Sequence, residues 1–410
     1  MIAMRWWGLA GALGAAALTA AGCGSSSSGS AAPPPATSQG AISMEIQSVT
    51  LPDPASASTS GGQQRPVVRF RVIDTTTNQP LNLANEAAAS IASPPGIPNT
   101  IPRFTLAQRD DRNDYRSYYG TVANPVPYTT PTGYTTPPAA PALQATYQPP
   151  SGKYPVADLK DVGGGFYELT LPPTNQTGFD RTKTHTIAGW TVRSNGTADA
   201  DVSMAFMDFV PAGGTPTTFE TVTDDRCNQC HGFVQAHGTR RGVHLCITCH
   251  NPFTTDPDTS RTVDFKVLIH KIHSGSTLPS VMQGKGYFIV GFKGAIADFS
   301  DVVFPYHNHG VAHCTVCHSG GAQSGNWSQI PTANVCTSCH DNVSFALGSA
   351  LDPCPVGTAA SGSFNDCLHT GGPITISSTP GPGDARDPNN CLGCHGPGTV
   401  AAIDKFHHGD

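Results

Sequence analysis

Charged side chains are scarce in this chain of 410 residues: Asp, Glu, Lys and Arg make up 13% of it, about half their usual share. A basic excess is also missing, because the formal net charge is −6, so we expect no nucleic-acid partner. The 44 glycines and 36 prolines exclude a coiled coil or a compact helical enzyme. Only 38% of the residues are hydrophobic. We therefore expect something other than side chains to fill part of the interior.

Apolar runs long enough to cross a membrane are lacking as well. A short apolar run, Gly8 to Ala21, follows a basic start and precedes Cys23, which predicts a signal peptide over residues 1–22. The segment from Ala20 to Cys23 resembles a bacterial lipobox, so Cys23 is predicted to carry lipid and to contact a membrane. Residues 23–40, rich in Ser, Gly, Ala and Pro, then form a flexible linker. The alternative is a plain secretory signal with an incidental cysteine.

Cysteine is absent from residues 41–221, and histidine nearly so. Several stretches of this region alternate apolar and polar residues, for example Val68, Phe70 and Val72 with arginines between them. Such alternation, broken by Gly, Pro, Asn and Asp, is typical of half-buried antiparallel strands. We therefore predict an all-β sandwich or split barrel over residues 41–222.

Inside this region, Tyr115 to Pro155 holds seven of the ten tyrosines and nine prolines. Proline removes a backbone donor, so we predict a long surface excursion rather than sheet core. Two interpretations stay open: an irregular loop stiffened by proline, and a dedicated contact surface.

The composition changes abruptly at Asp224: the remainder carries twelve of the thirteen cysteines and fifteen of the sixteen histidines. Five Cys-x-x-Cys pairs occur there, and a histidine follows each at once. The motifs are Cys227-x-x-Cys230-His231, Cys246-x-x-Cys249-His250, Cys314-x-x-Cys317-His318, Cys336-x-x-Cys339-His340 and Cys391-x-x-Cys394-His395. Two thiols at this spacing can add to the two vinyl groups of one haem, and the adjacent imidazole then binds the iron.

Zinc and disulfides are the competing explanations for these motifs. Zinc would use the thiolates themselves as ligands, and a disulfide would need no histidine. We therefore predict five covalently bound c-type haems in a loop-rich, sparsely helical pentahaem domain over residues 223–410. At that density the macrocycles themselves form the core.

The sixth ligand of each iron decides what such a domain can do. Met282 is the only methionine after residue 223, so methionine can serve at most one iron. Beyond the five proximal histidines the domain has ten more. They are His237, His244, His270, His273, His307, His309, His313, His369, His407 and His408. We expect mostly bis-histidine, low-spin irons, which pass electrons well and bind small substrates poorly.

His270 and His273 lie three residues apart on a predicted helix over residues 264–273. This spacing places them on neighbouring parts of one face, where they can serve two closely packed haems. Cys354 and Cys367 have no place in the five motifs. A disulfide that pins the loop carrying His369 fits them best, and a sixth, aberrantly attached haem is the alternative.

With these motifs in place, the sequence resembles the OmcA/MtrC family of outer-membrane multihaem c-type cytochromes, used in extracellular electron transfer. The likeness rests on Cys227 to Gly232 with Ala236-His237-Gly238 and Arg240, Cys246 to Pro252, Val263 to Gly275, Asp301 to Pro305, Cys336 to Asp341 and Cys391 to Gly398, and more weakly on Pro66 to Val72 and Thr184 to Thr186. In that family a β-sandwich or split barrel precedes each pentahaem domain, and the usual members repeat the pair. This chain has a single pair.

The resemblance implies the distal ligands residue by residue. They are His237, His270, His273, His369 and His407. His408 could replace His407. The remaining histidines of the domain, His244, His307, His309 and His313, would then lie behind the ligands or at the surface.

The function expected from these features is extracellular electron transfer through five bis-histidine haems, to an insoluble metal oxide or a partner cytochrome. The chain would be an outer-membrane lipoprotein facing the cell exterior, or alternatively a periplasmic one. Two alternatives stay open: a subunit of a polymeric haem filament or outer-membrane conduit, possible as a homo-oligomer, and a multihaem reductase of a small oxyanion. All five motifs end in His, which favours an electron carrier over a substrate-specific enzyme with an open iron.

Overall fold

The computed structural model describes residues 40–52, 65–83, 100–149, 158–174, 178–194, 200–305, 310–330, 332–345, 367–369, 389–399, 401–405 and 407. The predicted signal peptide, Cys23, Cys354, His307, His309 and His408 lie outside the described residues. No helix in the described ranges is long and apolar enough to cross a membrane.

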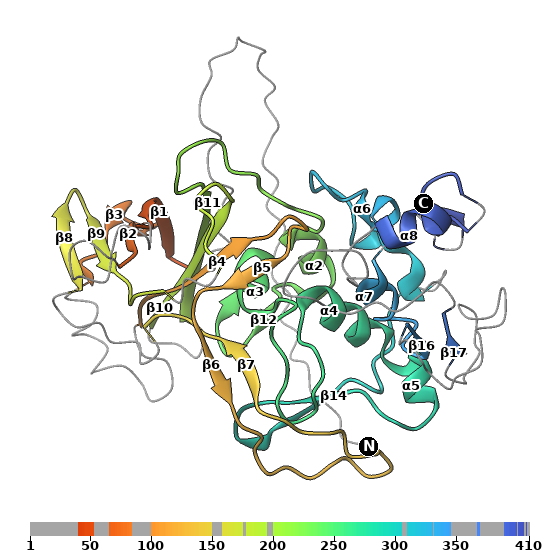
Figure 1. The fold of residues 1–410 in the computed structure, drawn as a ribbon. Coiled ribbons are helices and arrows are strands. Elements are labelled where there is room, and N and C mark those ends of the chain that lie inside the picture. Colours follow the sequence, from red (N-terminus) through yellow and green to blue (C-terminus); the bar gives the residue numbers. More distant parts are fainter. Residues whose placement is uncertain are drawn as a thin grey trace, which may run out of the picture. The chain divides into compact units, whose positions relative to one another are not determined.

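Five antiparallel strands form the first sheet, in the order β1-β2-β9-β8 with β3 paired to β2 (Figure 1). They are β1 (Ile42–Thr50), β2 (Val67–Asp74), β3 (Gln79–Pro80), β8 (Leu159–Gly163) and β9 (Phe166–Thr170). Every second residue of β2 is buried, namely Val68, Phe70 and Val72, while Arg69 and Arg71 are partly exposed. Side chains alternate between the two faces of a strand, so this sequence buries one apolar face.

Four antiparallel strands form the second sheet, in the order β11-β10-β4-β5. They are β4 (Thr100–Arg109), β5 (Tyr115–Ser117), β10 (His185–Ser194) and β11 (Ala200–Phe209). Side chains from both sheets share one core, in which Phe70 packs edge-on against Phe104 with ring centroids 5.2 Å apart. Arg193 joins the sheets through ion pairs to Asp74 and Asp201 at 2.8 and 3.1 Å. The all-β prediction for this region is confirmed.

The segment rich in tyrosine and proline differs from its prediction in two ways. Tyr115, Tyr118 and Tyr119 are buried in the β region, so its first residues are not a surface excursion. Strands β6 (Gly120–Ala123) and β7 (Ala142–Ala145) then form a two-stranded sheet. Between these strands, Tyr134 stacks on Phe288 at 6.2 Å between ring centroids, and the Ala140 amide donates to the Pro257 carbonyl. The excursion is a contact surface for the region after residue 223.

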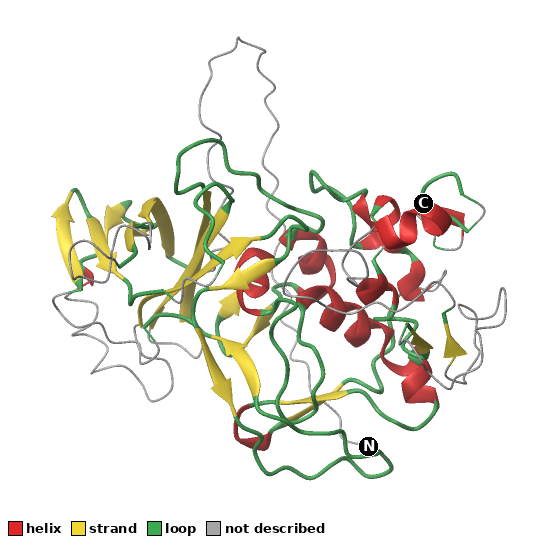
Figure 2. Cartoon of the chain, in the orientation of Figure 1, coloured by secondary structure: helices red, strands yellow, loops and turns green. Residues whose placement is uncertain are grey.

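That second region consists of short helices joined by loops (Figure 2). The helices are α2 (Asp224–His231), α3 (Val243–Cys249), α4 (Phe265–Ser274), α5 (Pro279–Met282), α6 (Asn326–Gln329), α7 (Ala333–Cys336) and α8 (Asn389–His395). Three strand pairs accompany them: β12 (Gln235–Ala236) with β13 (Arg240–Arg241), β14 (Phe288–Val290) with β15 (Ile296–Asp298), and β16 (Val343–Ser344) with β17 (Cys367–Leu368). Among the described residues, the buried hydrophobic clusters draw only Leu245 from beyond residue 223.

Helix α3 connects the two regions, since it packs against the second sheet. The Thr248 hydroxyl lies 2.7 Å from that of Thr105 on β4, and Leu245 joins the cluster around Trp190. Lys266 on α4 also forms an ion pair with Asp114. The described residues belong to one compact unit, Pro35–Asp410. The boundary at residue 222 stays a prediction, although strand β11 ends at Phe209 and helix α2 begins at Asp224.

Candidate haem-binding sites

The five Cys-x-x-Cys-His motifs lie at helix ends or in helical turns. The first is the C-terminal half of α2, the second ends α3, and the fifth ends α8. The third forms a 3₁₀ turn over Cys314–Val316, and the fourth begins at the last residue of α7. A helical turn brings residues three apart to the same side, so both sulfurs of each motif can reach one macrocycle.

Each proximal histidine lies beside one of the five predicted distal histidines. The distances between ring centroids are 5.8 Å for His250 with His237, 5.9 Å for His231 with His273, 6.1 Å for His318 with His270, 6.1 Å for His340 with His407, and 6.2 Å for His395 with His369. These pairs join residues between 13 and 67 positions apart in the sequence.

The narrow spread of these distances is informative. A metal–imidazole bond is about 2 Å long and the bonding nitrogen lies about 1 Å from its ring centroid, so two axial rings on one iron have centroids about 6 Å apart. Rings in direct stacking contact lie closer, as for His244 and Phe206 with centroids 3.7 Å apart. The five pairs therefore leave the space that one iron needs, and the residues present fit a haem at each position.

Hydrogen bonds orient several of these imidazoles. The Nδ1 atoms of His250, His273 and His395 lie 2.9, 3.0 and 3.0 Å from the backbone carbonyls of Val263, Ile269 and Ala401. A carbonyl can only accept, so Nδ1 carries the proton and donates. The lone pair is then on Nε2, the nitrogen that faces away and can bind iron.

Burial affects the charge of two of the predicted ligand histidines, His270 and His250. It lowers the pKa of His270 to about 4, with His318 and His273 adding to the effect, and it lowers the pKa of His250. Both imidazoles are neutral near pH 7, which is the form that binds a metal. Burial also raises the pKa of Cys246 to about 12 and that of Cys249 to about 11. A neutral thioether suits these surroundings better than a thiolate does.

Helix α4 carries two of the predicted distal histidines, as its spacing predicts. His270 pairs with His318 and His273 with His231, so the two rings serve different motifs. The helix ends at Gly275, whose φ of 39° and close approach to the Val302 carbonyl leave no room for a Cβ. This turn fixes the end of α4 relative to the loop at residue 302.

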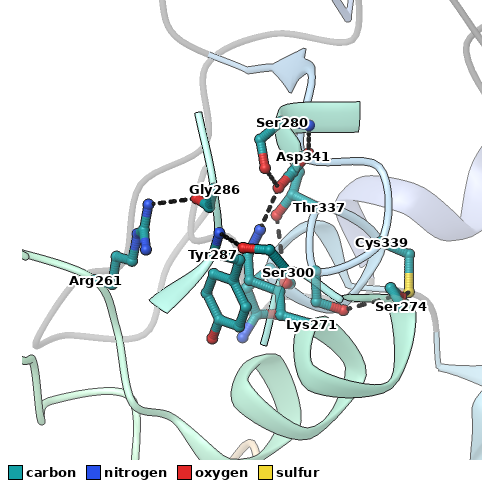
Figure 3. A network of polar contacts seen from close by, with 12 residues as sticks. Arg261, Lys271, Ser274, Ser280, Gly286, Tyr287, Ser300, Thr337, Cys339 and Asp341 are labelled. Atoms are coloured by element: carbon teal, nitrogen blue, oxygen red, sulfur yellow. Dashed lines mark hydrogen bonds and ion pairs between the residues drawn. The ribbon is translucent and has the colours of Figure 1, made fainter. Parts of the chain in front are cut away.

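A polar network between α4 and the fourth motif was not predicted from the sequence (Figure 3). Lys271 Nζ lies 2.7 Å from Asp341 Oδ2, and Ser280 donates to the same carboxylate through its hydroxyl and its amide. The Ser274 hydroxyl donates to the sulfur of Cys339 at 3.2 Å. In the sequence, Lys271 lies between the two α4 histidines and Asp341 directly follows His340, but neither position by itself predicts their contact.

The other described histidines have different surroundings. His244 stacks on Phe206, and its Nε2 lies 3.8 Å from Glu220 Oε1. His185 lies inside the β region, where its Nε2 is 2.7 Å from the Tyr118 hydroxyl. Cys367 is buried, and its partner and the predicted pairing with Cys354 involve residues outside the described ranges.

Comparison with known proteins gives consistent matches. Residues 220–408 match the family model described as outer membrane cytochrome MtrC/MtrF-like, domains II/IV. The multiheme cytochrome MtrC of Shewanella baltica (strain OS185) is 29% identical over 154 residues, which cover 36% of this chain and 18% of that protein.

Among solved structures, the outer membrane decaheme cytochrome OmcA is similar with a TM-score of 0.57 and 20% identity, covering 74% of this chain and 44% of that one. The structure of MtrC from Shewanella baltica OS185 matches at a TM-score of 0.46 and 18% identity, covering 89% and 44%. The chain thus spans less than half the length of these relatives. The likeness to OmcA supports the fold, a β region followed by a sparsely helical region. Residues 220–408, a little under half of the chain, are therefore similar to domains II/IV of the MtrC/MtrF-like outer membrane cytochromes.

Proposed function

We propose that this chain is an electron carrier with five c-type haems, each held by the two cysteines of one Cys-x-x-Cys-His motif and by two histidines, the one in the motif and one distal histidine. The observation that carries this proposal is the fivefold repetition of one geometry, with imidazole centroids 5.8 to 6.2 Å apart. The proposed axial pairs are His231 with His273, His250 with His237, His318 with His270, His340 with His407 and His395 with His369. Two axial ligands leave no open position on the iron, so the chemistry is electron exchange rather than substrate turnover.

The cysteine contacts support an order of the haems. Burial raises the pKa of Cys246, Cys227, Cys314 and Cys336, and in each case a cysteine of another motif adds to the shift. The neighbours are Cys227 for Cys246, Cys317 for Cys227, Cys339 for Cys314 and Cys391 for Cys336. We propose that electrons pass along the motifs in the order second, first, third, fourth and fifth. Helix α4 supports the middle of this order, because His273 pairs with His231, His270 pairs with His318, and Ser274 donates to Cys339.

The fifth haem depends on a short strand pair. The amide of Cys367 donates to the Asn342 carbonyl and that of His369 to the Ser344 carbonyl, which places His369 beside His395. We propose that a disulfide between Cys354 and Cys367 holds His369 in this position. The sulfur of Cys367 is engaged in a disulfide, which supports this pairing.

The location and partners follow from the relatives named above. OmcA and the matched family are outer membrane cytochromes, so we propose an outer-membrane location, with the chain attached through lipid on Cys23 and facing outward. Its acceptor would be an insoluble metal oxide or another multihaem cytochrome. The alternative proposal is that the chain acts as a subunit of a haem filament or of an outer-membrane conduit.

Haem stoichiometry and spin state test the proposal together. The purified protein should carry five haems per chain by mass spectrometry and pyridine haemochrome, and only low-spin ferric signals by EPR. Replacing one distal ligand, His270→Ala, should convert a single haem to a high-spin form that binds carbon monoxide, because that iron alone loses its sixth ligand. His244→Ala is the matched control, since His244 stacks on Phe206 and pairs with no motif. Fewer than five haems, or a high-spin signal in the unaltered protein, would contradict the proposal.

A further inference from the structure

Helix α4 contacts three of the five motifs. Its His273 pairs with His231 of the first motif and its His270 with His318 of the third. Two more of its side chains reach the fourth motif: Ser274 donates to Cys339, and Lys271 pairs with Asp341, the residue after His340 (Figure 3). A single helix of ten residues therefore joins three sites that lie far apart in the sequence.

The contact between Lys271 and Asp341 is largely withdrawn from solvent. The side chains of Lys271 and Asp341 are 18% and 9% exposed. The carboxylate accepts from Lys271 Nζ at 2.7 Å, from the Ser280 hydroxyl at 2.6 Å and from the Ser280 amide at 3.0 Å. The aromatic ring of Tyr287 covers the ammonium group, with Nζ 5.4 Å from its centroid. A buried carboxylate with three donors has few alternative positions, because any displacement breaks charge-assisted hydrogen bonds.

The contact between Lys271 and Asp341 bears on electron transfer because each residue lies next to a proposed iron ligand. Lys271 is adjacent to the ligand His270, and Asp341 is adjacent to the ligand His340. The pair therefore connects the segment that carries His340, in the fourth motif, to helix α4, whose His270 pairs with the third motif. Cys314 and Cys339 of these two motifs are close enough to interact electrostatically.

We propose that Lys271 and Asp341 form a positioning pair that sets the separation of the third and fourth haems, and that the net charge of this pair sets the reduction potential of the fourth. This inference rests on the haem ligation proposed above. Asp341 places a negative charge beside His340, which favours the ferric iron, and Lys271 offsets that charge.

The two roles are separated by three variants of the haem-loaded full chain. Lys271→Met leaves the Asp341 charge without its cation, so the reduction equilibrium constant of one haem should fall about tenfold, or 59 mV for a one-electron couple. Asp341→Asn should shift the same haem about tenfold in the opposite direction. The double variant K271M/D341N removes both charges, so its potential should return to that of the unaltered protein. The single-molecule conductance of the double variant should nevertheless be about tenfold lower than that of the unaltered protein, because the contact that positions the two haems is gone.

Lys266→Met is the matched control, because Lys266 lies on the same helix and pairs with Asp114 of the β region. It should change neither the potential of that haem nor the conductance. The potentials are measured by EPR-monitored redox titration, which resolves individual haems. Normal conductance in the double variant would overturn the positioning role, and unshifted potentials in both single variants would overturn the charge role.

Failure of the haem ligation itself gives a different result, namely fewer than five haems or a high-spin signal in the unaltered protein. Should Lys271→Met not mature, Ser280→Ala removes only one hydroxyl donor from the same carboxylate. It should lower the potential of the same haem by a smaller amount, and no shift there would overturn the proposal.

Discussion

The β region and the region after residue 223 fill their interiors in different ways. The buried clusters of the β region consist mostly of large apolar side chains, and Phe70, Phe104 and Leu169 are fully enclosed. In the second region many of the most deeply buried side chains are polar, for example Asp256 and Ser338. The first region therefore has a core made of its own sequence, whereas the second needs another molecule to supply apolar volume.

The buried polar groups of the second region show how its loops keep their shape. Asp256 accepts from the Thr259 hydroxyl, the Asp258 amide and the Val290 amide. Such hydrogen bonds fix the backbone locally but contribute little net free energy of folding. The difference between the regions predicts that removing haem and removing side chains will damage opposite halves of the molecule.

The largest expected effect follows from blocking haem attachment. In cells that lack cytochrome c maturation, residues 224–410 should fail to fold, because their interior is missing, while the β region keeps its sheets. Limited proteolysis with mass spectrometry should show cleavage throughout the second region and a protected fragment that starts near residue 41. A haem-free chain that is protected over its whole length would remove the distinction between the two regions.

A truncation in the β core is expected to have the next largest effect, in the other half. Phe70→Ala deletes a fully buried ring that packs on Phe104 and should cost about 3–5 kcal/mol of β-region stability. Hydrogen exchange of peptides from β2 and β9 measures this loss, and the haem spectrum should stay unchanged. Val122→Ala, at a residue 67% exposed, is the control with no expected effect. A changed haem spectrum in Phe70→Ala would show that the β core shapes the haem sites.

The sequence predicted much of this arrangement, for identifiable reasons. Alternation at Val68, Phe70 and Val72 requires only a local pattern, and the Cys-x-x-Cys-His motif is equally local. The three-residue spacing of His270 and His273 predicted two different haem sites, because both rings lie on one face of α4. The contact of Lys271 with Asp341 spans 70 residues and depends on how α4 packs against the fourth motif, which no local pattern encodes. Tyr118 and Tyr119 were predicted to lie on a surface excursion but are buried, because the prediction rested on the composition of the whole segment rather than on its individual residues.

Acid should weaken the β region through His185. Burial lowers the pKa of this histidine from 6.5 to about 4. Between these values the unfolded chain binds a proton that the folded chain does not, so stability is complete above pH 6.5 and falls as the pH drops toward 4. The loss should reach about 2–3 kcal/mol, measured by hydrogen exchange of the β10 peptides. His185→Phe removes the titrating group and should flatten this profile. An unchanged profile would assign the acid sensitivity to other groups.

The smallest expected effect tests whether the two regions stabilise each other. Thr105 on β4 and Thr248 on α3 share a buried hydrogen bond of 2.7 Å. Thr105→Val removes the partner of the Thr248 hydroxyl, which still donates to the Leu245 carbonyl, and should cost about 1–2 kcal/mol. Replacing both by valine should cost less than the sum of the two single changes, because the hydrogen bond that the two hydroxyls share is lost only once. If the two regions are coupled, hydrogen exchange should increase in both β4 and α3. An increase confined to β4 would mean that the apolar core and the haem sites fold as separate units that merely touch.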